Sequence, residues 1–244
     1  MKLKFIAYLF LVVQVIIGMT LLVLTDKLKI SNNFKTGIIF TSLLLLNLLY
    51  VRVFILKTSI KTYWSLRKLY YLPAGVVAGL LLIIIPIAMA LGTGNLNADA
   101  LHIDDLSLSS IFITFLIISW EELWFRSLLL NYCSRYISKF NIALTVGFLF
   151  MLIHGLNPKI SLLKEGPILF LAGTLLTALY FYYRNIWLPV GLHFGNNFFG
   201  TITHTNIDEH SLFGSEGYIY TLLLLVAVVF FLLKLWKTRL EYLD

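Results

Sequence analysis

The chain has 244 residues, of which 59% are hydrophobic and 13% are charged, and its mean hydropathy is +0.89. This composition excludes a soluble globular protein and predicts an all-α, polytopic membrane protein. We attribute the net charge of +7 to basic loops that orient the protein in the membrane and attract anionic lipid, rather than to nucleic-acid binding. Because Cys133 is the single cysteine, an intrachain disulfide and a cysteine-based zinc cluster are also excluded.

Eight apolar segments are long enough to be candidate transmembrane helices. In chain order they lie at about 5–25, 37–56, 72–93, 108–133, 139–156, 166–183, 187–204 and 217–236. The first is too long for the core of a signal peptide, so we expect it to be retained as a span. No loop is long enough for a soluble domain. We therefore expect residues 1–244 to form a single integral-membrane domain, a bundle of about eight helices.

Basic loops predict the orientation of this bundle, because Lys and Arg are retained on the cytoplasmic side of a membrane. The second loop, together with the end of the second segment, has no acidic residue and carries Arg52, Lys57, Lys61, Arg67 and Lys68. The loop after the third segment has no basic residue and carries Asp99, Asp104 and Asp105. We expect both termini to be cytoplasmic. The richness in Leu, Ile, Phe and Lys favours a bacterial plasma membrane.

Two adjacent carboxylates, Glu121 and Glu122, lie inside the fourth apolar segment. A carboxylate at the centre of a bilayer costs about 2.5–3.5 kcal/mol, so each needs a partner, a wet cavity or a chemical role. Arg126 follows Glu122 by four residues, the favourable spacing for an ion pair on a helix. Glu121 is rotated by about 100° from Glu122 and faces elsewhere. We therefore expect one structural carboxylate and one that takes part in chemistry.

Further polar residues lie in the fifth and seventh segments, where hydrocarbon would otherwise surround them. His154 shares a helix face with Phe150 near the outer end of the fifth segment, and His193 shares a face with Asn197 in the seventh. Neutral imidazole and carboxamide groups donate hydrogen bonds without a buried charge. Asn196 points about 100° away from Asn197 and is interpreted as a packing or capping residue. These groups predict a polar cavity inside the bundle.

Three motifs thus occur in order along the chain. They are Glu121-Glu122-x-x-x-Arg126, Phe150-x-x-x-His154 and His193-x-x-x-Asn197. The ordered set resembles the CAAX-processing and bacteriocin-processing (CPBP, or Abi) family of intramembrane proteases. The resemblance covers about residues 108–204, a family-like catalytic core, and the remaining spans are similar only as hydrophobic helices.

The resemblance implies an eight-helix endopeptidase that cleaves a membrane-associated peptide or protein near its C-terminal region. It also implies that Glu121 and His154 activate a water molecule, while His193 and Asn197 bind the oxyanion. These roles agree with general base catalysis in a low-dielectric cavity and with the need of an oxyanion for directed donors. The ion pair of Glu122 and Arg126 would position the catalytic helix.

A zinc-dependent alternative exists within the same resemblance, with Glu121, His154 and His193 as ligands. The His-Glu-x-x-His motif of soluble zinc proteases is absent from the sequence. Asn197 is a poor zinc ligand but suits an oxyanion site. We therefore favour a glutamate mechanism without metal or other cofactor, and keep zinc as the alternative.

Two other functional classes remain open at the level of sequence. A proton-coupled transporter would use Glu121, His154 and His193 as a relay, although transporters often contain internal repeats and none is visible here. A non-catalytic bacteriocin-immunity or binding protein would keep the fold without the reaction. Each polar group also has a structural interpretation, as a helix-packing clamp or an interhelical hydrogen bond.

Overall fold

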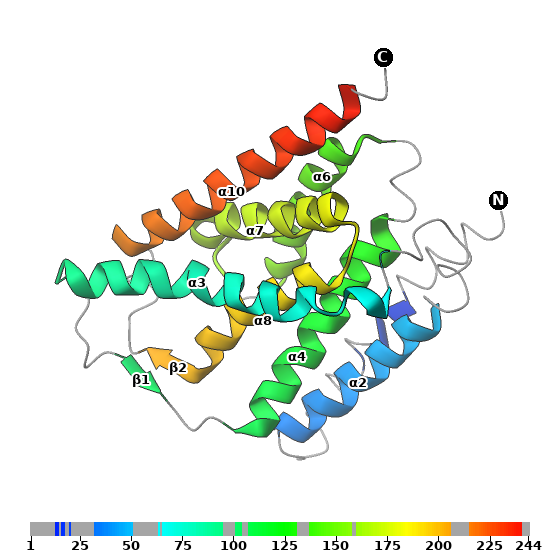
Figure 1. The fold of residues 1–244 in the computed structure, drawn as a ribbon. Helices are drawn as coiled ribbons and strands as arrows, with labels where there is room; N and C mark the ends of the chain where they lie inside the picture. The colour runs from blue at the N-terminus through cyan, green and yellow to red at the C-terminus, as the bar shows by residue number, and fades with distance from the viewer. Residues whose placement is uncertain are drawn as a thin grey trace. The chain divides into compact units, whose positions relative to one another are not determined.

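The computed structural model describes residues 13–14, 16–17, 20, 32–50, 63, 65–94, 101–103, 107–130, 137–157, 160–205 and 215–240. Within these ranges the named elements are seven α-helices, one π-helical segment, one 3-10 turn and two short strands (Figure 1). The chain divides into two compact units that alternate along the sequence. Unit 1 comprises Met1–Lys61 and Leu106–Tyr132, and unit 2 comprises Thr62–Asp105 and Cys133–Asp244.

In unit 1, helix α2 (Asn32–Tyr50) packs against helix α4 (Leu108–Leu123). The rings of Phe40 and Trp120 meet edge to face across this interface, with their centroids 5.5 Å apart. Such aromatic contacts add to the hydrophobic burial that holds two apolar helices together.

The start and the end of α4 have different local causes. Its first turn is capped by the hydroxyl of Ser107, which accepts the backbone N–H of Ser110 at 3.1 Å. At its other end the chain continues directly into the π-helical segment η5 (Trp124–Leu129). π-helical turns are rare in proteins, but those that occur are often found at functional sites. Here the π-helical segment begins at Trp124, shortly after the two glutamates.

Unit 2 contains a tight helix pair, α3 (Tyr71–Gly92) and α8 (Trp187–Ile202). A Cβ atom added to Gly79 of α3 would overlap a backbone carbonyl of α8, and one added to Gly195 of α8 would overlap a backbone carbonyl of α3. Small residues at these positions let the two backbones approach closely. This contact fixes the helix on which two of the predicted site residues lie.

The rest of unit 2 is formed by α6 (Lys139–His154), α7 (Leu162–Tyr183) and α10 (Ser215–Leu240). Helix α7 packs against both α6 and α10 (Figure 1). A Cβ atom on Gly173 of α7 would lie 2.7 Å from the Cβ atom of Phe150, so glycine permits the α6–α7 contact.

Short elements connect the helices of unit 2. The 3-10 turn η3 (Leu66–Lys68) precedes α3. Strands β1 (Leu101–Ile103) and β2 (Thr203–Thr205) pair antiparallel, with His102 opposite His204. The sheet therefore joins the segment after α3 to the residues that follow α8.

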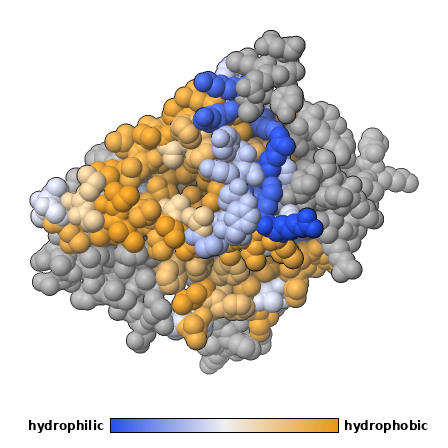
Figure 2. All heavy atoms as spheres, viewed as in Figure 1, coloured by the Kyte–Doolittle hydropathy of each residue, from blue (hydrophilic) through white to orange (hydrophobic). Residues whose placement is uncertain are grey.

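Four described helical segments are long and apolar enough to cross a membrane: Tyr71–Gly92, Leu108–Arg126, Leu162–Tyr183 and Ile219–Lys237. Large apolar side chains are exposed along these segments; examples are Val77 and Leu81 on α3, and Val226 and Phe230 on α10. Figure 2 shows apolar surface over both helices. Outward-facing side chains of this kind are suited to contact with lipid. The chain is accordingly a helical membrane protein.

The predicted segments agree with the positions of the observed helices, but the expected number of spans does not agree with the described part of the structure. Helix α3 lies within one residue of the predicted segment, α7 begins four residues before its predicted start, and the segment at 5–25 lies largely outside the described residues. The described chain does not reach the expected eight spans. Helix α8 has 16 residues, or roughly 24 Å, which is short of the bilayer core of about 30 Å. Its polar side chains also lower its hydropathy.

Candidate functional site

A cavity of about 140 Å³ lies inside unit 2 and is bordered by α3, α6, α7, α8 and α10. Most of its lining is apolar. Its polar lining residues are His154, His193, Asn196, Asn197 and Tyr220. Three of the predicted site residues thus share one cavity, and two further polar residues accompany them.

His154 is the last residue of α6 and has a defined tautomer when its ring is neutral. Its Nδ1 atom lies 2.9 Å from the backbone carbonyl oxygen of Phe150. A carbonyl oxygen only accepts hydrogen bonds, so Nδ1 carries the proton in this contact. The lone pair of the neutral ring is therefore on Nε2, where it can accept a proton from a water molecule.

His193 and Asn197 lie one helical turn apart on α8 and contact each other directly. The Asn197 Nδ2 atom is 3.2 Å from the His193 Nε2 atom, and His193 is only 6% exposed. An amide nitrogen donates, so Nε2 accepts and the proton of neutral His193 lies on Nδ1. The i, i+4 spacing predicted from the sequence produces this contact.

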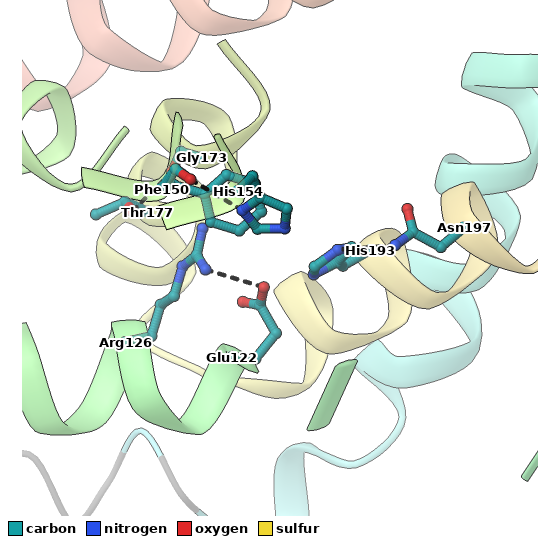
Figure 3. Close-up of polar contacts among 8 residues, drawn as sticks. All are labelled: Glu122, Arg126, Phe150, His154, Gly173, Thr177, His193 and Asn197. Atoms are coloured by element: carbon teal, nitrogen blue, oxygen red, sulfur yellow. Dashed lines mark hydrogen bonds and ion pairs between the residues drawn. The ribbon is translucent and has the colours of Figure 1, made fainter. Parts of the chain in front are cut away.

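The ring of Phe150 contacts both histidines (Figure 3). Its centroid is 4.1 Å from that of His154, with 31° between the ring planes, and 5.9 Å from that of His193, at 64°. Gly173 leaves the room that the Phe150 side chain occupies. One buried aromatic residue therefore orients the two imidazoles of the cavity.

In unit 1, Glu122 and Arg126 form the ion pair expected from their spacing. The Arg126 Nη1 atom donates to the Glu122 Oε1 atom at 3.0 Å, and neither side chain is exposed. The guanidinium also lies 5.4 Å from the ring centroid of Phe125, within cation–π range. Glu121 is only partly buried, in contrast to Glu122. The two adjacent carboxylates therefore have different surroundings.

The predicted site residues come from both units. His154, His193 and Asn197 are together in unit 2, while Glu121, Glu122 and Arg126 belong to unit 1. The cavity-lining roles of Asn196 and Tyr220 were missed by the sequence analysis. Asn196 was interpreted as packing or capping, and the adjacent Asn197 was the only signal for it. Tyr220 begins a Leu-rich run, with nothing in its spacing that relates it to α8.

No group of three His, Cys, Asp or Glu side chains close enough to hold a metal ion occurs within the described part of unit 2. The zinc alternative takes Glu121 from unit 1 and the two histidines from unit 2. That ligand set therefore remains a prediction about how the two units assemble.

Comparison with known protein families gives a match over residues 104–199. The matching family is described as Rce1-like, type II CAAX prenyl endopeptidase Rce1-like. Residues 104–199 are an Rce1-like domain. The expected resemblance to the CAAX-processing proteases is thereby confirmed. No curated protein and no solved structure matches the chain.

The Rce1-like domain takes residues from both units. It begins just before α4 and ends within α8, so it contains all six predicted site residues. The family supports a CAAX-type intramembrane endopeptidase at the level of the class. Tyr220 lies beyond the Rce1-like domain, on α10.

Proposed function

We propose that this protein is an intramembrane endopeptidase that cleaves a membrane-associated peptide or protein near its C-terminal region. The observation that supports this most directly is the cavity of unit 2, in which His154, His193 and Asn197 lie among apolar helices. The Rce1-like domain contains these three residues and supports the same class of reaction. A CAAX-type substrate, anchored in the bilayer, would reach such a cavity from the membrane.

In the proposed reaction, Glu121 and His154 activate a water molecule. The oxygen of the water attacks the carbonyl carbon of the scissile peptide bond, and its proton passes to Glu121 or to Nε2 of His154. The same proton is later donated to the nitrogen of the leaving amine when the C–N bond breaks. The hydrogen bond from His154 Nδ1 to the Phe150 carbonyl supports this role, because it leaves Nε2 as the acceptor.

His193 and Asn197 bind the oxyanion that forms on the carbonyl oxygen. A donor aimed at a developing oxyanion typically contributes about 3–4 kcal/mol to lowering the barrier. Both side chains donate without carrying charge, and their mutual contact at 3.2 Å reduces their rotational freedom. The buried ion pair of Glu122 and Arg126 holds the turn of α4 and η5 that carries Glu121.

We favour the metal-free mechanism over the zinc-dependent one. The Asn197 amide donates a hydrogen bond to Nε2 of His193. A metal ion bound at that nitrogen would have to displace the amide. Should the zinc mechanism hold, the ligands would be Glu121, His154 and His193, and zinc would polarise the scissile carbonyl. Activity that survives a strong chelator, in protein with no zinc by elemental analysis, is expected from the metal-free mechanism.

The function is tested by comparing peptides released from membranes of cells that carry the wild type or a variant. Glu121→Gln and His154→Ala should each abolish the release of specific peptides, since each removes a group that moves the proton. Thr145→Ala, on the same helix as His154 and exposed, is the matched control and should leave the peptide pattern unchanged.

The same comparison separates the competing functions. Correctly inserted Glu121→Gln and His154→Ala variants that retain full biological activity would exclude the protease. That result would leave a non-catalytic binding protein. A change in proton flux across vesicles, without any difference in released peptides, would instead support a transporter.

A further inference from the structure

Four polar side chains form a continuous series of hydrogen bonds along one wall of the cavity in unit 2. The Tyr220 hydroxyl donates to Asn196 Oδ1 at 2.9 Å, and Asn196 Nδ2 donates to Asn197 Oδ1 at 3.4 Å. Asn197 Nδ2 then contacts His193 Nε2 at 3.2 Å. The series joins α10 to α8 and ends on an imidazole of the predicted site.

The direction of this series matters because a carboxamide has a donor end and an acceptor end. When Asn197 presents its nitrogen to His193, the ring nitrogen Nε2 must accept, and Nδ1 carries the proton. A turned Asn197 would present its oxygen instead and require the proton on Nε2. Asn197 is held in the first orientation because Asn196 donates to its oxygen.

Tyr220 decides which of the two directions is favoured. Among the described residues its hydroxyl has one hydrogen-bond partner, Asn196, and the other residues of α10 and α7 that line the cavity are apolar. If Asn196 turned its nitrogen towards Tyr220, the hydroxyl would become the acceptor. Its proton would then lose the oxygen to which it donates. Removing a polar hydrogen from water without an acceptor is unfavourable, so the direction that starts from the Tyr220 hydroxyl is preferred.

We propose that Tyr220 and Asn196 are positioning residues that fix His193 in the Nδ1–H tautomer and Asn197 in its donating orientation. This inference rests on the proposed function for its catalytic meaning, but not for its geometry. It gives α10 a role in the site although α10 lies outside the Rce1-like domain. For the reaction, a fixed tautomer means that Nδ1–H of His193 is the donor the ring offers to the oxyanion.

The proposal is tested by the nitrogen chemical shifts of the imidazoles in histidine-selective ¹⁵N-labelled protein. The chain has five histidines, and His193→Gln identifies the His193 signals. At about pH 8, where an ordinary imidazole is neutral, wild-type His193 should show protonated Nδ1 and unprotonated Nε2. Tyr220→Phe should convert this pattern into a mixture of the two tautomers, because either direction of the amides then becomes possible.

Two further variants make the experiment decisive. Tyr182→Phe removes a hydroxyl from a partly exposed tyrosine on α7, away from the series, and should leave the His193 signals unchanged. Asn196→Ala breaks the series in the middle and should produce the same mixture as Tyr220→Phe. The proposal is overturned if wild-type His193 carries its proton on Nε2, or if folded Tyr220→Phe and Asn196→Ala both keep the wild-type pattern.

Peptide release distinguishes this inference from the function on which it rests. Tyr220→Phe should slow release by about 10- to 100-fold, as expected when a catalytic group is misplaced without being removed. Unchanged release together with unchanged His193 signals would remove the positioning role and leave the protease intact. A tautomer change in protein whose wild type releases no peptide would leave the positioning geometry and remove the protease.

Discussion

The Glu122–Arg126 pair is a charge pair that has no exposed side-chain surface. Two charges withdrawn from water are costly, and their mutual attraction and hydrogen bond offset part of that cost. Deleting one partner therefore leaves the other charge buried and poorly compensated. Replacing one residue of the pair should therefore lower the stability of the protein more than replacing both.

We predict that Arg126→Met lowers the free energy of unfolding by about 3–5 kcal/mol, as for other buried pairs that lose one partner. The double variant Glu122→Gln with Arg126→Met should be distinctly more stable than Arg126→Met, since it buries no unpaired charge. Thermal unfolding in one detergent measures both. Arg67→Met, at an exposed position on η3, is the control and should behave as the wild type. Equal stability of the single and double variants would contradict this account.

Residue-scale features were predictable from the sequence when they lay within one helical turn. The contacts of Glu122 with Arg126 and of His193 with Asn197 both follow from i, i+4 spacing. The contact of Tyr220 with Asn196 spans 24 residues and depends on how α10 packs against the cavity. Spacing carries no information about such a pair, because it exists only after the helices have assembled.

Among the elements, the α3–α8 pair depends on glycines at which no side chain fits. Gly79→Ala would place a Cβ atom 2.7 Å from the backbone nitrogen of Asn196, and would also overlap the carbonyl of Leu192. Backbone atoms cannot rotate away as a flexible side chain can. The two helices would have to separate, and α8 would move with the residues it carries.

We predict that Gly79→Ala destabilises the protein by about 1–3 kcal/mol, the usual cost of overpacking a tight contact. It should also reduce peptide release, since α8 is displaced. Gly92→Ala, at the end of the same helix, meets nothing within 4 Å and is the matched control. Unfolding temperature and release rate are measured side by side. If the two alanine variants behaved alike, close backbone contact would not be what holds α8.

Helix boundaries were predicted well where an apolar run has clear ends, as in α3. They were predicted less well where local hydrogen bonding determines the type of helical turn. The predicted segment 108–133 contains α4 and then η5, because hydropathy does not distinguish an α turn from a π turn. Helix α8 carries its polar residues inside the cavity of unit 2. The length of an apolar run that faces lipid is therefore a poor criterion for predicting α8.

For the whole molecule, membrane insertion was predictable from composition, whereas the division into units was not. Each unit is made from two separate stretches, so the chain passes between units three times. The Rce1-like domain follows this alternation, because its first residues belong to unit 2, its acidic motif to unit 1 and its histidines to unit 2. The proposed pairing of Glu121 with His154 takes one residue from each unit, and no local pattern in the sequence relates the two.

The orientation of the assembled chain remains a prediction from its basic loops. The loop that leads into α3 contains Arg67 and Lys68, which should keep it in the cytoplasm. Counting spans from there places the turn between α6 and α7 on the opposite side. Two leucines serve as reporters: Leu66 before α3 is 73% exposed, and Leu163 at the start of α7 is 95% exposed.

We predict that Leu163→Cys, in a Cys133→Ser background, reacts with a membrane-impermeant maleimide in intact cells. Leu66→Cys should react only after the membrane is permeabilised. The Cys133→Ser protein alone contains no cysteine and is the control for background labelling. Leu66 should stay inside because the positive charges near it resist transfer across the membrane. Leu163 should lie outside because the chain crosses the membrane an odd number of times between Leu66 and Leu163. Labelling of Leu66→Cys in intact cells, with Leu163→Cys protected, would mean that the chain inserts in the reverse orientation and that both termini face outward.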